Sequence, residues 1–257
     1  MSRRIRRALV TVAFALLCSV TIAAVSPFSL PVGAIVLDAG HGGHDPGAIA
    51  TDPDGKSKPL VEKDIVLDVT VQTADLLMRW YPDLQVVLTR SDDQFVSLQS
   101  RADIASQLDP GTGKSTLLVS IHANASHTPE ASGVEFLIKR SDKRIRFLDQ
   151  NVPDWALFRY ADYTTNELNQ LLNRENVVLA ATIRDRFLSR FPESRDRGIK
   201  EQDLWILNAS KVPSVLVELA FMTHPVEGRN LANPSWRSEA ARALAEGIAD
   251  YINRYRF

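Results

Sequence analysis

The chain is poor in cysteine and carries no excess charge of either sign. Cys18 is the single cysteine among 257 residues, which excludes a disulfide scaffold and any zinc or iron–sulfur site that needs several cysteines. With 30 Lys and Arg residues against 31 Asp and Glu, the formal net charge is −1, so composition gives no general reason to expect nucleic-acid binding. Charged residues make up 24 % and hydrophobic residues 45 % of the chain, which argues against disorder or a coiled coil.

Residues 1–30 have the layout of a secretory signal peptide. Several arginines at the start precede an uncharged apolar run, Ala8–Ala24, and small residues follow it. We therefore predict a signal peptide over residues 1–30, with cleavage near Ala24 or Ser26. An uncleaved N-terminal anchor is the alternative, because about 17 apolar residues lie at the lower limit for spanning a bilayer. After cleavage we expect no stable membrane span and an extracytoplasmic location, periplasmic or associated with the cell wall.

The remainder of the chain, residues 31–257, contains several strand candidates. They are short, continuous apolar runs rich in β-branched residues, as in strands that are buried on both faces. These runs are Ala34–Asp38, Gln85–Thr89, Leu117–Ile121, Gly133–Ile138, Leu204–Leu207 and Ser214–Glu218.

Helical patterns lie between these strands. Apolar residues at helical spacing predict helices over Glu62–Trp80, Leu98–Leu108 and Asn173–Phe191. A last helix is expected after Asn233 and Pro234, which suit an N-cap and a first helical position. Strand–helix alternation of this kind predicts a single α/β domain, with a mostly parallel sheet of about six strands and helices on both faces.

One connection is unusually long. Nearly 60 residues separate the predicted strand that ends near Ile138 from Arg197 and Gly198. The stretch 140–170 is less regular than the predicted helix that follows it. We interpret it either as an extra helical insert on the surface or as a lid over the functional site, because long insertions in compact domains are often functional.

Four polar residues follow or precede the predicted elements at one edge of the sheet. In an open α/β sheet, ligands bind outside the carboxyl ends of the strands. His41 follows the first predicted strand, His122 follows Leu117–Ile121, and Glu218 ends the last strand. Glu62 opens the first predicted helix, so it faces the same edge. We expect these two histidines and two glutamates to meet there.

Such a group suits metal chemistry. Two neutral imidazoles and one carboxylate make a three-ligand zinc site that leaves a position for water, and a second carboxylate can act as a base. Taken singly, a histidine is usually not a metal ligand but a surface residue or a hydrogen-bonded core residue. Glu62 could likewise simply complement the helix dipole. Glu218 is harder to explain in this way, because it lies between two apolar triplets, where an unpaired buried carboxylate is costly.

Motifs along the chain resemble those of the zinc-dependent N-acetylmuramoyl-L-alanine amidases. The resemblance runs in order from about residue 33 to the C-terminus. It is carried by Leu37–Gly43, Asp45–Ala48, Glu62–Asp64, Leu88–Arg90, Arg101 and Ala102, Val119–Ala125, Gly133–Glu135 and Pro213–Glu218.

The resemblance implies a role for each of the four residues. His41, Glu62 and His122 would bind Zn²⁺, and Glu218 would be the catalytic carboxylate. The implied reaction is hydrolysis of the amide between N-acetylmuramic acid and L-alanine in peptidoglycan, for cell-wall remodelling or cell separation. In some members a helical insert occludes the zinc until a protein activator binds, and residues 140–170 occupy the corresponding place.

Other interpretations remain open from the sequence. His44 is the rival metal ligand, because it is close to His41 in the chain. A zinc peptidase on a related scaffold is one alternative function. A catalytically silent wall-binding homologue that keeps the fold is the other.

Overall fold

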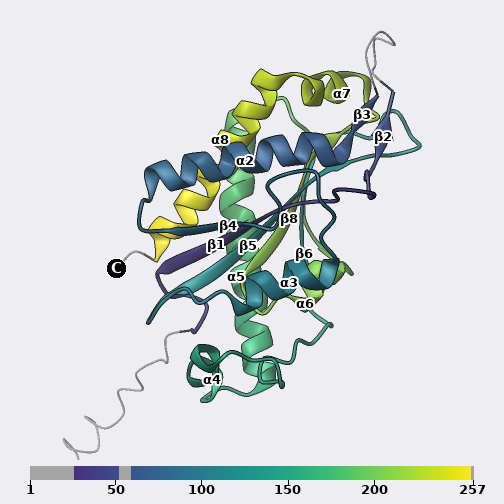
Figure 1. The fold of residues 1–257 in the computed structure, drawn as a ribbon. Coiled ribbons are helices and arrows are strands. Elements are labelled where there is room, and N and C mark those ends of the chain that lie inside the picture. The colour runs from purple at the N-terminus through teal and green to yellow at the C-terminus, as the bar shows by residue number, and fades with distance from the viewer. Residues whose placement is uncertain (1–25, 52–58, 256–257) are drawn as a thin grey trace, which may run out of the picture.

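The computed structural model describes residues 26–51 and 59–255, and its centre is a six-stranded sheet (Figure 1). Residues 1–25, which hold most of the predicted signal peptide, lie outside the described residues. The strand order is β4-β1-β5-β8-β6-β7. The strands are β1 (Val32–Ala39), β4 (Gln85–Leu88), β5 (Ser115–Asn124), β6 (Val134–Lys139), β7 (Asp196–Gln202) and β8 (Ser214–Phe221).

The sheet is mixed, with one reversal of direction. β4, β1, β5 and β8 are parallel neighbours, whereas β6 runs antiparallel to β8 and β7 runs parallel to β6. The predicted α/β class with about six strands is confirmed. The carboxyl ends of β1, β5 and β8 meet at one edge, and the start of β6 lies at this same edge because of the reversal.

Helices cover both faces of the sheet, as expected (Figure 1). The interior strands are buried on both sides, which explains their continuous apolar sequence. One face carries α2 (Glu62–Trp80), α5 (Thr165–Arg190) and α8 (Pro234–Arg254), and the other carries α3 (Leu98–Gln107) and α6 (Trp205–Ala209). The remaining elements are α4 (Asp154–Tyr160), α7 (Pro225–Ala232) and a small antiparallel pair, β2 (Ile49–Ala50) with β3 (Leu60–Val61). Within the described residues, no helix is long and apolar enough to cross a membrane.

The predicted strand Leu204–Leu207 is wrong. This segment forms helix α6, which buries Ile206 and Leu207 against the second face of the sheet. The strand at this point is instead β7, a mostly exposed edge strand with the sequence DRGIKEQ. An edge strand that buries little has no apolar run to reveal it, whereas a short buried helix has one.

The long helix α5 begins earlier than predicted. Thr164 accepts a hydrogen bond from the backbone N–H of Glu167, and the Glu167 side chain accepts one in return from the Thr164 N–H. This capping box starts the helix at Thr165, well before Asn173. Val177, which the periodicity places inward, is 45 % exposed.

Residues 140–170 lie at the edge of the sheet opposite to the carboxyl ends of β1, β5 and β8 (Figure 1). Because β6 is antiparallel to β8, its last residue, Lys139, lies at that opposite edge. From there the insert packs around Phe28, with Phe147 and Tyr160 in the same apolar cluster. Asp149 also forms an ion pair with Lys211, 2.7 Å long. The insert thus has the position of a surface element, and a lid function stays a prediction.

Candidate metal centre

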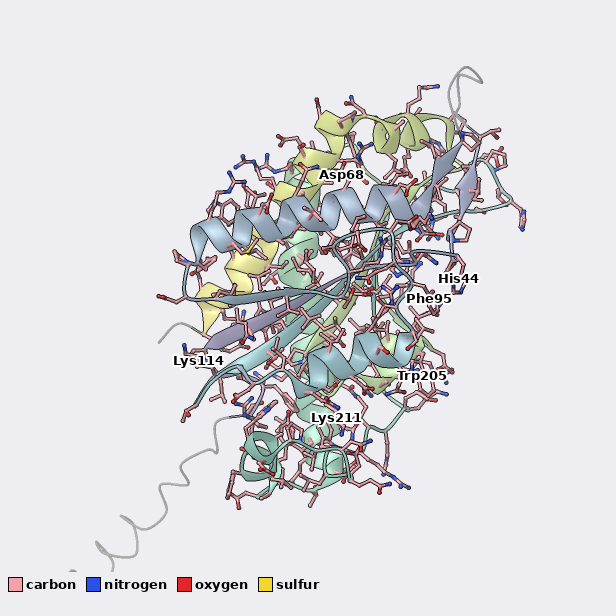
Figure 2. The ribbon with its side chains drawn as sticks, viewed as in Figure 1. His44, Asp68, Phe95, Lys114, Trp205 and Lys211 are labelled. Carbon is pink, nitrogen blue, oxygen red and sulfur yellow. The ribbon has the colours of Figure 1, made fainter. Side chains whose placement is uncertain are left out.

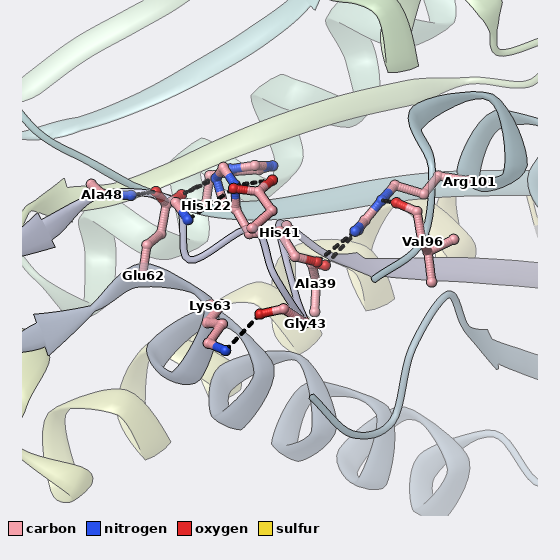
Figure 3. Close-up of polar contacts among 12 residues, drawn as sticks. Ala39, His41, Gly43, Ala48, Glu62, Lys63, Val96, Arg101 and His122 are labelled. Carbon is pink, nitrogen blue, oxygen red and sulfur yellow. Dashed lines mark hydrogen bonds and ion pairs between the residues drawn. The ribbon is translucent and has the colours of Figure 1, made fainter. Parts of the chain in front are cut away.

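The fold brings His41, Glu62 and His122 together at the carboxyl edge of the sheet (Figure 3). His41 lies in the loop after β1, Glu62 is the first residue of α2, and His122 lies near the end of β5. One ligand atom from each residue lies within 4.8 Å of the others. The two imidazole rings approach edge to face, with centroids 4.9 Å apart. Three side chains from distant parts of the sequence can therefore reach a single ion.

Glu62 is the centre of this cluster. Its Oε1 lies 3.1 Å from Nε2 of His41 and 2.9 Å from Nδ1 of His122. The backbone N–H of Ala48 donates to Oε2, and that of Ala123 donates to Oε1. Burial alone would raise the pKa of Glu62, but the hydrogen bonds and charges of the two histidines outweigh it and hold the pKa well below its usual range. Glu62 is thus a carboxylate, the form that binds a metal.

His41 is oriented by a carboxylate on its far side. Its Nδ1 lies 2.9 Å from Oδ2 of Asp45, which leaves Nε2 directed toward Glu62. Burial lowers the pKa of His41, but Glu62 and Asp45 together outweigh burial and raise it to about 9. A carboxylate that accepts from one ring nitrogen while the other nitrogen binds a metal is a common arrangement in metalloproteins.

The donor set fits a divalent cation of the zinc type. Two imidazole nitrogens and one carboxylate oxygen are ligands that zinc accepts, and three protein ligands leave a coordination position for water. The pKa of His122 is also raised, despite burial, by Glu62 and Glu218. Two histidines whose pKa values are raised around one carboxylate indicate a place where excess negative charge is neutralised by protons or by a metal.

Glu218 lies next to this cluster on β8. In the sheet register it is paired with His122 of β5 on one side and with Glu135 of β6 on the other. The side chain keeps some solvent contact, but its Oε2 is buried and has no hydrogen-bond partner within the described part of the chain. Burial raises the pKa of Glu218 to about 7. A carboxyl group that titrates near neutral pH beside a metal-type cluster is suited to taking up and releasing a proton.

Two buried arginines hold the loop that presents His41. Arg101 donates to the backbone oxygens of Val96, Ala39 and His41 and to the buried carboxylate of Asp38 (Figure 3). His41 has a positive φ of 59°, which is uncommon for a residue with a side chain. The hydrogen bonds of Arg101 fix the backbone on both sides of this turn.

Arg90 completes the support from the other side of the loop. It donates to the carbonyl oxygens of Ala39, Gly40 and Lys63 and to that of Asp92. The sequence contained both arginines within the amidase-like motifs but gave no indication of this role. Long-range contacts from guanidinium groups to backbone carbonyls leave no periodic signal in a sequence.

Glycine is required at position 47, where the backbone lies against the cluster. Gly47 has a φ of +66°, and a Cβ there would lie 2.6 Å from Oε2 of Glu62 and 2.6 Å from Cδ2 of His41. Its N–H donates to Oδ1 of Asp45, the residue that orients His41. The backbone therefore passes close to the candidate ligands, and only glycine leaves room for them.

His44 and two other polar residues, His224 and Asn124, have structural surroundings. His44 lies outside the cluster and packs its ring against that of Phe95, with centroids 4.2 Å apart. His224 accepts a hydrogen bond from the N–H of Glu227 and so caps α7. Asn124 accepts from the N–H of Ala125, which orders the turn after β5. The rival ligand His44 is thus not placed with His41.

A cleft of about 330 Å³ opens beside the cluster. Its polar lining comes mainly from the end of β1, the loop that follows it and the end of β5, and its apolar lining comes from the segment before α3, the start of α3 and α6. The lining residues are Asp38, Gly40, His41, Asp45, Phe95, Val96, Leu98, Arg101, His122 and Ile206.

The fold and the site together define an α/β protein with a histidine–carboxylate centre at the carboxyl edge of its sheet. Residues 35–250 match the family model of N-acetylmuramoyl-L-alanine amidase, and the chain belongs to this family. It is 31 % identical over 220 residues to the uncharacterized protein YqiI of Bacillus subtilis. That match covers 86 % of this chain and 85 % of YqiI. It is also 31 % identical over 234 residues to N-acetylmuramoyl-L-alanine amidase AmiC of Neisseria meningitidis. That match covers 85 % of this chain, which spans about half, 52 %, of the meningococcal protein.

Solved structures of similar proteins have the same fold. The N-acetylmuramoyl-L-alanine amidase AmiC2 of Nostoc punctiforme superposes with a TM-score of 0.63 at 29 % sequence identity. The superposition covers 86 % of this chain and 97 % of the other. Nearly the whole of that solved chain is therefore matched by the domain described here.

Proposed function

We propose that this protein is a zinc-dependent N-acetylmuramoyl-L-alanine amidase that hydrolyses the amide between N-acetylmuramic acid and L-alanine in peptidoglycan. The observation that carries the proposal is the cluster of His41, Glu62 and His122 with Glu218 beside it, whose buried Oε2 has no hydrogen-bond partner among the described residues. Membership of the amidase family supports the substrate, because the relatives that carry a functional name are named for this reaction.

His41, Glu62 and His122 would hold the zinc ion. When bound, zinc acidifies water and polarises a carbonyl group, which are the two things that amide hydrolysis needs. By accepting from Nδ1, Asp45 would leave Nε2 of His41 available to the ion. The carboxylate of Glu62 stays ionised because both histidines and two backbone N–H groups stabilise it.

Glu218 would move the proton. Its pKa of about 7 lets it accept a proton from the attacking water and return it to the leaving alanine nitrogen. The buried Oε2 of Glu218 has no partner among the described residues, so no hydrogen bond has to break before it acts. The side chain of Lys200 is ion-paired with the neighbouring Glu135, which limits the negative charge at this edge.

The central experiment combines metal analysis with substrate cleavage. Purified protein is expected to contain one zinc per chain and to release intact stem peptides from purified peptidoglycan, identified by mass spectrometry. Glu218→Gln should keep the zinc and lose turnover by about 10²-fold or more, because only the proton-transfer group is removed. Cleavage within the stem peptide would indicate a zinc peptidase instead. Bound zinc without any turnover in the unmodified protein would indicate a silent wall-binding homologue.

The cellular setting follows from the same proposal. A peptidoglycan hydrolase acts outside the cytoplasm, in agreement with the export signal that residues 1–30 predict. We also retain the prediction that a protein activator acts on the insert, residues 140–170. Because the residues that line the cleft come from other parts of the chain, such an activator would have to work without uncovering the site directly.

A further inference from the structure

The cleft beside the cluster of His41, Glu62 and His122 has an apolar wall to which the proposed hydrolysis assigns no role. Phe95, Val96, Leu98 and Ile206 line it, opposite His41 and the ends of the parallel strands. Phe95 is 47 % exposed and Leu98 is 56 % exposed. Large apolar side chains that stay exposed at the mouth of a cleft commonly mark a binding surface.

Trp205 is a further exposed aromatic residue, at the start of α6. It precedes Ile206 in the chain and is 56 % exposed, although the helix around it buries its other apolar residues. Figure 2 shows Trp205 at the margin of the molecule, on the same side of the view as Phe95 and His44. We refer to Phe95, Leu98 and Trp205 as the apolar rim.

The backbone that carries Phe95 is held firmly. Asp93 accepts from the N–H of Gly43 and from the ammonium of Lys63, which also donates to the Gly43 carbonyl. Arg101 holds the next part of the segment by donating to the carbonyl of Val96. An exposed aromatic ring on a fixed backbone loses little conformational freedom when it binds a ligand.

The chemistry of the wall selects between the two halves of the substrate. The guanidinium of Arg101, which also lines the cleft, is buried and already donates to Asp38 and to backbone carbonyls. Its donor groups are therefore not free to bind the carboxylates of a stem peptide. A pyranose ring, in contrast, presents apolar C–H faces and, in N-acetylmuramic acid, acetyl and lactyl methyl groups. Aromatic rings bind such surfaces through contact area.

Two basic side chains of β7 near Glu218 are also engaged in ion pairs. Lys200 and Arg197 lie against Glu135, which is the register partner of Glu218. Although the Lys200 side chain is 46 % exposed, its ammonium is paired with Glu135. Neither group is therefore free to bind the carboxylates of a stem peptide.

We propose, on the basis of the function proposed above, that the apolar rim is the glycan subsite of the enzyme. The sugar chain lies over Phe95, Leu98 and Trp205. The rim would thus set the preference of the enzyme for substrates with sugars on both sides of the cleaved muramoyl unit.

The test compares soluble substrates that share one stem peptide but differ in glycan length. The unmodified protein is expected to have a lower KM for a chain of several disaccharides than for a single disaccharide. Phe95→Ala and Trp205→Ala should each raise the KM for the longer glycan by about five- to tenfold and leave kcat within about twofold, which is typical of a lost aromatic contact. Phe95→Tyr and Trp205→Phe should retain most of the affinity.

Control measurements separate this inference from the proposed reaction. Phe158→Ala is the matched control, because Phe158 is 87 % exposed on α4, away from the cleft; its KM should not change. Zinc content and thermal unfolding report whether each rim variant is intact. If the unmodified protein cleaves no muropeptide, the proposed function fails. If it cleaves them but the rim variants keep their KM, or change it with stem-peptide length instead of glycan length, the glycan subsite is refuted and the amidase function stands.

Discussion

Replacing Arg101 with lysine should weaken metal binding although Arg101 contacts no metal ligand side chain. The guanidinium makes four hydrogen bonds, to Val96 O at 2.8 Å, Asp38 Oδ1 at 2.6 Å, Ala39 O at 2.6 Å and His41 O at 2.5 Å. A lysine ammonium is a compact donor that lacks the planar fork, so it can replace only some of them. Losing two bonds to a charged group costs about 3 kcal/mol or more at roughly 1.5–3 kcal/mol each.

The expected effect has two parts. The thermal midpoint of the metal-free protein should fall by about 6–12 °C, since roughly 1 kcal/mol corresponds to about 2–4 °C in a domain of this size. The zinc affinity should fall by about 10- to 100-fold, the range found when a group that orients a ligand is removed. The weaker zinc binding would result from loss of the hydrogen bond from Arg101 to the carbonyl of His41, a residue with a positive φ. Zinc affinity is measured by competition with a chromophoric chelator.

Two further variants serve as a matched control and as a more disruptive substitution. Arg79→Lys changes an arginine on the exposed face of α2, so both readouts should stay within experimental error. Arg101→Ala removes the only ion-pair partner that the described residues provide for the buried Asp38, which costs about 3–5 kcal/mol and threatens folding itself. The lysine variant is therefore the informative one. A folded Arg101→Lys protein that binds zinc as tightly as the unmodified protein would refute the idea that this arginine positions His41.

Further predictions concern the cluster and the insert. His41→Ala should bring zinc content close to zero by elemental analysis, and unchanged content would remove His41 from the ligand set. In the metal-free protein the pKa of His41 is raised from 6.5 to about 9, so its stabilising contribution is complete below pH 6.5 and is lost as the pH rises through about 9. The difference in thermal midpoint between the unmodified protein and His41→Gln should therefore shrink from pH 6 to pH 9.5; a constant difference would contradict this. Phe147→Ala, in the buried cluster of the insert, should lower stability by about 3–5 kcal/mol without raising turnover, whereas higher turnover would support a lid.

The sequence was sufficient to predict the interior strands, because β1, β5 and β8 are buried on both faces and therefore read as continuous apolar runs. The same criterion failed for β7, the outermost strand on one side of the sheet. β7 lies mostly exposed, and the apolar residues nearest to it in the chain belong to α6. A pattern based on burial cannot distinguish an apolar turn of helix from a strand when the segment is only five residues long.

The proximity of His41, Glu62 and His122 was predictable for a different reason. Polar residues at the carboxyl ends of neighbouring parallel strands must meet at one edge, and the register of β1 with β5 places His41 and His122 there. Glu62 opens α2 directly after β3, which pairs with β2. The hydrogen bonds by which Arg101 holds the loop of His41 were not predictable in this way. Arg101 reaches its partners across about 60 positions of sequence, and its choice of backbone carbonyls depends on the exact path of the loop at His41.

The reversal at β6 explains why the site and the insert lie apart. The start of β6 places Glu135 beside Glu218, while its end delivers the chain to the opposite edge, where the insert packs on Phe28. A physical connection between the two edges nevertheless exists. Asn176 of α5, the helix that follows the insert, accepts from the backbone N–H of Ser214 at the start of β8, the strand that carries Glu218. A partner bound to the insert could therefore affect the site by shifting α5 against β8, and Asn176→Ala, which removes this hydrogen bond, should weaken that route.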